Sequence, residues 1–176
     1  MAETIAEGHR AVEAEERLRH AARAAIADEL KADSDLPYAA VDRLHTLYEL
    51  ALPTGLRKGE LLGLHWEDLD LNGGTATIHR SLQRTRSGGL TVLNTKTLAS
   101  ERRIALPTEC INSLKIHQER QQEDRQAAGT GWMGNRLVFT TPKGRPLDPT
   151  NVTRRFHRLL HKAGIRTIRF HEQLQI

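Results

Sequence analysis

The stretch Thr54–Trp66 reads Thr-Gly-Leu-Arg-Lys-Gly-Glu-Leu-Leu-Gly-Leu-His-Trp, and it indicates the fold more strongly than any other part of the chain. It places Arg57 at the start of a short apolar helix, directly after a Thr-Gly turn. Glu60 follows one helical turn later on the same side, where it can act as a structural support. The expected buried face consists of Leu61, Leu62 and Leu64. An arginine held in this way keeps its charge and presents a planar fork that suits phosphate, whereas a surface ion pair with Glu60 is the alternative.

Length and composition favour one well-buried domain of ordinary globular type, with room for a small appendage. No apolar run approaches the length of a membrane span, and the first residues lack the apolar core of a signal peptide. The single cysteine, Cys110, excludes an internal disulfide and fits a reducing compartment. We therefore expect a cytoplasmic protein without a membrane partner, in which Cys110 is an inert thiol.

The formal charge of +4 conceals a strong segregation of charge along the chain. Residues 1–35 hold nine acidic and five basic side chains, whereas residues 80–103 hold six basic side chains against Glu101 alone. Residues 136–169 hold nine arginines and lysines, with His157 or His161 as a tenth basic group if protonated, against Asp148 alone. This segregation favours a polyanionic partner, most simply double-stranded DNA. A basic surface without any partner is the alternative.

The first half of the chain has the pattern of two helices that lead into Thr54–Trp66. Residues 3–31 are rich in alanine, glutamate and arginine and predict a polar helix with a thin apolar stripe. Pro37 can begin the second helix. Its apolar face is expected to contain Val41, Leu44, Leu47, Tyr48 and Ala51, which makes Tyr48 a core residue.

The second half alternates short strands, tight turns and two helices. Residues 75–80, 90–93 and 103–106 predict three short strands that form one small antiparallel sheet. Thr108 can cap a long helix that reaches about residue 128, a loop follows over residues 129–134, and residues 137–139 predict a brief extended segment. Asp148 and Pro149 can begin a last helix, which Gly164 ends. The fold class is therefore α+β, mainly α-helical, with a small three-stranded antiparallel sheet.

The helix that is expected to begin at Asp148 and Pro149 is strongly amphipathic. Its apolar positions are Val152, Phe156, Leu159, Leu160 and Ala163. Its opposite face carries Arg154, Arg155, Arg158, His161 and Lys162. Arginines in this arrangement can follow a phosphate backbone, and the alternative is that they only make an amphipathic helix soluble.

Two further motifs follow Arg57 in chain order. Lys96 lies in Asn94-Thr95-Lys96-Thr97, upstream of Ser-Glu-Arg-Arg-Ile-Ala-Leu-Pro at residues 100–107, and a hairpin lysine is a flexible donor that can reach into a groove. His171 lies in Ile168-Arg169-Phe170-His171-Glu172 near the end of the sequence. An exposed turn lysine and a solvated histidine are the ordinary alternatives.

Taken together, these motifs resemble the tyrosine recombinases, the phage integrase family, over about residues 36–173. The resemblance is strongest to the integrases of actinobacterial phages and integrative plasmids, through residues 95–97, 138–142 and 148–151. It implies that Arg57 is one of two arginines that grip the scissile DNA phosphate. It also implies that Lys96 protonates the leaving 5′ oxygen and that His171 handles the proton of the nucleophile and contacts the phosphate. The family needs no metal and no nucleotide cofactor.

The sequence departs from the family pattern after His171. The second arginine of the pattern should stand three residues later, where the chain has Leu174. The nucleophilic tyrosine should follow, but the two tyrosines, Tyr38 and Tyr48, both precede Arg57. We therefore expect a polar helical segment over residues 1–35 and a partial catalytic domain over residues 36–176 that is inactive alone and still binds DNA.

The side chains expected to contact DNA are Arg80, Arg84, Arg86, Arg154, Arg155, Arg158 and Lys162. One alternative function is a non-catalytic DNA-binding or regulatory remnant that occupies attachment sites or acts on an intact integrase. A second is an enzyme completed by a neighbouring subunit that donates the tyrosine, and Leu174 argues against it. The expected partners are attachment-site-like duplex DNA and either an intact integrase or further copies of this chain.

Overall fold

The computed structural model describes residues 44–94, 101–134, 136–162 and 164, together with the single residues 17, 24 and 28. Its helices are α2 (His45–Thr54), α3 (Lys58–Leu62), α4 (Thr108–Ala128) and α5 (Pro149–Lys162), with short 3-10 turns η1 (Trp66–Asp68) and η3 (Gly129–Gly131). Its strands are β1 (Leu69–Asp70), β2 (Thr75–Ile78), β3 (Arg80–Arg84), β4 (Leu90–Asn94) and β5 (Arg102–Ala105). The helix expected over residues 3–31 lies almost entirely outside the described residues.

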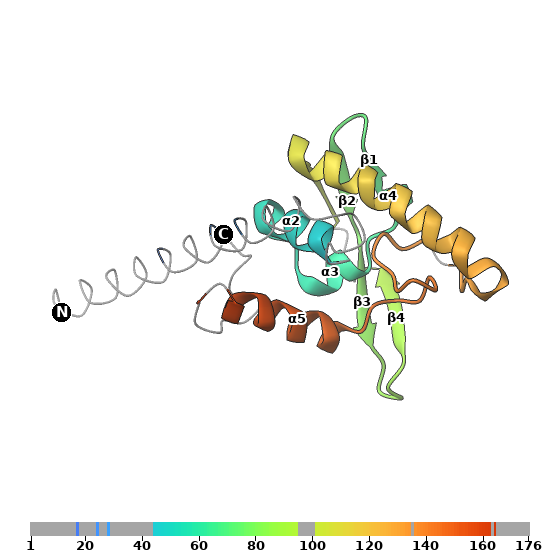
Figure 1. Cartoon of the computed structure of the whole chain (residues 1–176). Helices are drawn as coiled ribbons and strands as arrows, with labels where there is room; N and C mark the ends of the chain where they lie inside the picture. Colours follow the sequence, from blue (N-terminus) through green and yellow to red (C-terminus); the bar gives the residue numbers. More distant parts are fainter. Residues whose placement is uncertain are drawn as a thin grey trace.

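The strands form two small antiparallel sheets, and α4 and α5 lie toward opposite ends of them (Figure 1). A three-stranded sheet has the order β1-β2-β5, and β3 pairs with β4 in a separate hairpin. This arrangement confirms the α+β class and the three-stranded antiparallel sheet, but it corrects the expected membership of that sheet. Strand pairing is interrupted at His79, so the single strand expected over residues 75–80 is divided into the whole of β2 and the first residue of β3.

The turn at Gly88 explains why β4 pairs with β3. Gly88 has a φ of 87°, which glycine adopts without the steric cost that other residues meet, and the Thr85 N–H donates to the Gly89 carbonyl at 2.8 Å. The hairpin is therefore closed locally, with Arg84 opposite Leu90. The next strand, β5, returns to β2, where Ile104 lies opposite Ala76.

The core forms where the apolar faces of α2, α3 and α5 meet the sheets. The leucines expected to be buried after Arg57 are all at most 2% exposed. Tyr48 is also buried, its ring lies 5.9 Å from that of Phe156, and its hydroxyl donates to the Val152 carbonyl at 3.4 Å. The assignment of Tyr48 to the core is therefore confirmed. On α5, Val152, Phe156 and Leu160 are buried and Leu159 is half-buried against the core, whereas Ala163 lies outside the described residues.

The ends of the two long helices differ in how they are capped. The carboxylate of Asp148 accepts the Thr150 N–H at 2.8 Å, so it caps α5 as the sequence predicts. Thr108, in contrast, is the first helical residue of α4 and makes no capping hydrogen bond, because Pro107 occupies the cap position. Residues 137–139 are buried, with Leu137 bridged to His65, but they bend and do not form a regular strand.

Cys110 lies in the first turn of α4 and is buried. Burial, with help from the negative charges of Glu49 and Glu109, raises the pKa of its thiol to about 11. The thiol is therefore protonated at neutral pH, which agrees with the expectation of an inert thiol. None of the helices in the described part of the chain is long and apolar enough to cross a membrane.

Helix α3 lies directly against strand β3, and Gly63 makes this close approach possible. A Cβ atom at Gly63 would lie 2.7 Å from the Leu82 nitrogen and 2.9 Å from the Ser81 Cα, both of which are backbone atoms. Backbone atoms of a paired strand cannot move aside without breaking their ladder. The glycine is therefore required by space, since its φ of −93° is open to any residue.

We predict that Gly63→Ala lowers the free energy of unfolding by about 1–3 kcal/mol, because the added methyl group overpacks the contact between α3 and β3. Urea denaturation followed by circular dichroism measures this change. The matched control is Gly131→Ala, because no atom lies within 4 Å of a Cβ at that position. Equal stability of the two variants would contradict the proposed steric constraint.

Candidate nucleic-acid interface

Arg57 lies at the point where α3 begins. Its backbone is extended, with φ −67° and ψ 148°, and its N–H donates to Glu60 Oε2 at 2.9 Å. The side chain of Arg57 is exposed, and its guanidinium makes no hydrogen bond or close ion pair with a described residue, although its charge helps to lower the pKa of Glu60. The residue is thus fixed through its backbone while its charged group remains available to an external anion.

Glu60 is the buried centre of this site, at 6% exposure. Arg102, at the start of β5, grips its carboxylate with two hydrogen bonds of 2.9 and 2.8 Å. Burial by itself raises the pKa of Glu60, but hydrogen bonds from Arg102 and from the Arg57 N–H outweigh it, and the pKa lies below its ordinary value. The same pair raises the pKa of Arg102. Sequence reasoning counted Arg102 only as positive charge and missed its role as the partner of Glu60.

Lys58 connects the arginine motif to α5, which sequence reasoning also missed. Its ammonium group donates to Thr153 Oγ1 at 2.8 Å, and the Thr153 hydroxyl in turn donates to the Pro149 carbonyl. Burial lowers the pKa of Lys58, while the nearby charge of Asp148 acts in the opposite direction. This hydrogen bond holds the start of α3 against the start of α5.

The basic face of α5 borders a shallow cavity of about 370 Å³. Its charged lining consists of Arg154, Arg155 and Arg158 together with the carboxylate of Asp148, which pairs with Arg84. All three arginines are exposed, and so is Lys162 at the end of the helix. The structure therefore brings these four predicted residues onto one helix that is attached to the arginine motif.

The three arginines of the β3–β4 hairpin have different surroundings. Arg80 is only partly exposed and pairs with Asp68 at 2.5 Å and with Glu67 at 2.7 Å. Arg84 pairs with Asp148 at 2.5 Å, which joins the hairpin to the start of α5. Arg86 is exposed in the turn. Contact with DNA stays a prediction for all three, and Arg80 is the one already engaged by two carboxylates.

Lys96 and His171 lie outside the described residues. The segment that contains Lys96 is nevertheless flanked by defined positions, because β4 ends at Asn94 and β5 begins at Arg102. Since Arg102 binds Glu60 and Glu60 binds the Arg57 backbone, one end of that segment is attached to the arginine motif. Over the described ranges there is no group of three histidine, cysteine or acidic side chains that could hold a metal ion.

The lowered pKa of Glu60 predicts a pH-dependent contribution to stability. The ionised carboxylate stabilises the fold fully above its unfolded-state pKa of about 4.3, and this contribution is lost as the pH falls through the lower folded-state pKa. We predict that Glu60→Gln costs about 1–3 kcal/mol at pH 7 and that the difference from the unsubstituted chain shrinks below about pH 4. Chemical denaturation at both pH values measures it.

The control is Glu123→Gln, because Glu123 is exposed on α4 and makes no ion pair with a described residue. We expect this substitution to leave the stability unchanged at both pH values. A cost at Glu60 that does not depend on pH would show that the charge of its carboxylate is not what stabilises the site.

Comparison with known proteins agrees with the motifs. Residues 16–173 match the model of the phage integrase family. The chain is 37% identical over 143 residues to an integrase of Streptomyces ambofaciens, which covers 76% of this chain and 35% of that protein. It is 32% identical over 145 residues to a tyrosine recombinase XerC-like protein of Caldanaerobacter subterraneus subsp. tengcongensis, which covers 73% of this chain and 36% of that protein. The chain therefore spans about a third of the length of these relatives.

Solved structures show the same fold. The integrase of transposon Tn1549, in complex with a circular intermediate DNA, matches with a TM-score of 0.66 and 19% identity over 82% of this chain and 46% of that one. The XerA recombinase matches with a TM-score of 0.56 and 19% identity over 90% of this chain and 46% of that one. With the family match over most of its length and the intact motif around Arg57, the chain belongs to the phage integrase family, the tyrosine recombinases.

Proposed function

We propose that this chain is a DNA-binding part of a tyrosine-recombinase catalytic domain and that Arg57 grips a backbone phosphate. The observation that carries this proposal is the state of Arg57, whose backbone is bound to buried Glu60 while its exposed guanidinium has no partner among the described residues. A guanidinium that is exposed and makes no hydrogen bond binds phosphate without first breaking an internal hydrogen bond.

The basic face of α5 extends this surface. Lys58 holds the start of α3 against α5, so Arg57 and the α5 arginines belong to one packed unit. We propose that Arg154, Arg155 and Arg158 follow the backbone of duplex DNA, with Lys162, Arg84 and Arg86 at the edges. The Tn1549 integrase whose fold is similar is a DNA complex, which supports a DNA partner for this chain.

The proposed chemistry is that of the family. A tyrosine oxygen attacks the DNA phosphorus, a 3′-phosphotyrosyl bond forms, and the bond to the 5′ oxygen breaks as that oxygen takes up a proton. We propose that Arg57 stabilises the charge on the phosphate, that Lys96 supplies the proton and that His171 handles the proton of the nucleophile.

The present 176 residues lack two residues of the family pattern, the second arginine and the nucleophilic tyrosine. Leu174 stands where the second arginine is expected, and the only tyrosines are Tyr38 and Tyr48. Tyr48 is buried in the core and cannot reach a phosphate. Removal of one such preorganised donor costs about 10²–10³ in rate, and absence of the nucleophile removes the covalent route altogether. We propose that these residues occupy attachment-site-like DNA in the cytoplasm and alter the action of an intact integrase or of further copies, without cutting DNA themselves.

We predict that Arg57→Gln and Arg158→Gln each weaken binding to duplex DNA and make the slope of log affinity against log salt less negative by about 0.9, the value for one lost phosphate contact. Fluorescence anisotropy across a salt series measures this slope. The melting temperature of Arg57→Gln should fall only slightly, because the exposed guanidinium makes no hydrogen bond with a described residue and acts on Glu60 only through its screened charge.

Lys115→Gln is the matched control for loss of one exposed charge, because Lys115 lies on α4, away from α3 and α5. It should leave the slope unchanged. Binding that does not depend on salt, or an equal loss in all three variants, would defeat the proposed interface.

We also predict that the 176-residue chain forms no covalent adduct with a nicked suicide duplex, whereas an intact integrase run in parallel does. Denaturing electrophoresis of labelled DNA detects the adduct. When the two proteins are mixed, recombination should fall as the chain competes for sites. An adduct that contains this chain would contradict the inactive assignment.

A further inference from the structure

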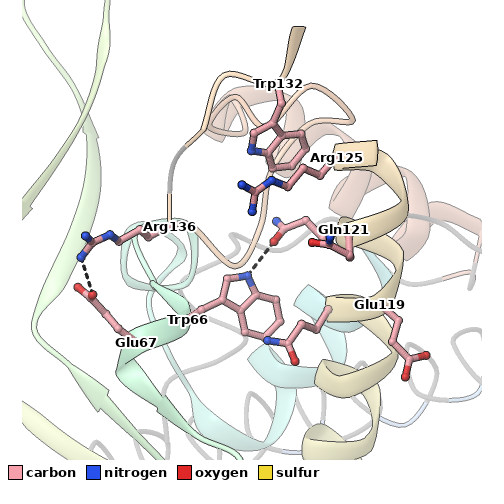
Figure 2. A pocket seen from close by; sticks show the side chains of 9 residues that line it. Trp66, Glu67, Glu119, Gln121, Arg125, Trp132 and Arg136 are labelled. Atoms are coloured by element: carbon pink, nitrogen blue, oxygen red, sulfur yellow. Dashed lines mark hydrogen bonds and ion pairs between the residues drawn. The ribbon is translucent and has the colours of Figure 1, made fainter. Parts of the chain in front are cut away.

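A second cavity, of about 780 Å³, has neither Arg57 nor any residue of α5 in its lining, and Figure 2 shows the side chains that surround it. It opens between η1, the second half of α4 and the segment that follows η3. Both tryptophans of the chain, Trp66 and Trp132, line it, and Arg125 and Arg136 add two positive charges. Nothing in the proposed grip on duplex DNA uses these residues.

The indole of Trp66 is fixed by its neighbours. Its Nε1 donates to Gln121 Oε1 at 2.7 Å, and its ring stacks on that of His117 with 6.1 Å between centroids. The Gln121 amide is itself bound, because it donates to the Val138 carbonyl at 3.0 Å and to Thr140 Oγ1 at 2.9 Å. A planar apolar surface is therefore held in place at the floor of the cavity.

The indole of Trp132 is fixed from the opposite side of the cavity. The backbone of Gly144 packs against it so closely that a Cβ at Gly144 would lie 2.7 Å from a ring carbon. The next residue, Met133, donates its N–H to the Lys143 carbonyl at 2.9 Å, which joins the two segments. The cavity thus has two planar walls whose positions are set by contacts with other parts of the chain.

The lining holds two arginines and two acids, and Arg125 is the arginine that can bind an anion. Arg125 is exposed and lies beside the Trp132 ring (Figure 2), and its guanidinium makes no ion pair with a described residue. Glu67 is occupied by Arg136 at 2.8 Å and by Arg80 at 2.7 Å, so its charge is neutralised by two arginines. Glu119 is the other acid in the lining, and it is exposed on α4.

We propose that this cavity binds a single nucleobase that carries a phosphate. The base stacks on an indole, the Gln118 and Gln122 side chains lie within the same lining as donors and acceptors, and Arg125 binds the phosphate. The ligand can come from two sources that share this chemistry, a free nucleotide or an unpaired nucleotide of a DNA strand.

The test uses the intrinsic fluorescence of the full chain, because Trp66 and Trp132 are its only tryptophans. The probe is deoxyadenosine 5′-monophosphate, with deoxyadenosine and inorganic phosphate as the separate halves of the ligand. A second arm compares a duplex that contains one unpaired adenosine with the fully paired duplex. Trp132→Phe and Trp66→Phe each leave one fluorescent tryptophan. Trp132→Ala removes the aromatic ring from one side of the cavity.

We expect saturable quenching by the nucleotide, weaker quenching by either half, and affinity about five- to 150-fold lower in Trp132→Ala. Arg125→Gln should lower affinity about tenfold or more, whereas Lys115→Gln on the same helix should not. Circular dichroism shows whether each variant is folded, and Arg125→Gln, which changes only an exposed side chain, keeps the test valid if Trp132→Ala unfolds.

The possible outcomes are distinct. Binding of the free nucleotide that depends on Arg125 supports a nucleotide site, and preference for the unpaired duplex that depends on Arg125 supports a strand-derived base. Absence of both effects, or binding that Arg125→Gln leaves unchanged, overturns the proposal. Failure of the paired duplex to bind at all, with nucleotide quenching intact, would reject the proposed DNA grip and leave this site standing.

Discussion

The arrangement of the site depends on the hydrogen bonds that the buried carboxylate of Glu60 accepts. This carboxylate accepts the Arg57 N–H and two hydrogen bonds from Arg102, so one buried group joins the start of α3 to the start of β5. A buried carboxylate without partners is costly, and a buried carboxylate with three charge-assisted or backbone donors is stable. The position of Arg57 therefore follows from the electrostatic requirement of its neighbour and not from any contact of its own guanidinium.

This carboxylate can be buried only because α3 approaches the β3–β4 hairpin closely. Gly59 and Gly63 lie one turn apart, and a Cβ at either position would meet Ser81 or Leu82 on β3. The glycines of Thr54–Trp66 thus permit the approach, the leucines fill the core behind it, and Glu60 closes the gap toward β5. The spacing of the motif is explained by packing as fully as by any chemistry of phosphate.

Local patterns in the sequence predicted the elements better than their pairing. The buried faces of α2 and α5, the cap at Asp148 and the core position of Tyr48 follow from spacing that each segment carries within itself. The pairing of the strands, in contrast, depends on segments that are far apart in the sequence. At His79 the chain passes from one sheet to another, and only the closed turn at Gly88 and the return of β5 to β2 decide which strands meet. No property of residues 75–80 taken alone distinguishes one strand from two.

The same limit applies to the site, and it changes how the basic residues are weighed. Counting charge treats all arginines alike, but the fold divides them into two groups. One group forms ion pairs within the fold: Arg80 pairs with Glu67 and Asp68, Arg102 with Glu60, and Arg136 with Glu67. Acidic side chains of the chain itself therefore compensate these three charges. Arg57, Arg154 and Arg158 are exposed on α3 and α5 and have no ion pair with a described residue. A phosphate that approaches the second group meets uncompensated charge, whereas one that approaches the first must compete with a carboxylate already in place. The electrostatic attraction for DNA is therefore concentrated on α3 and α5, a distribution that the linear order of charges does not contain.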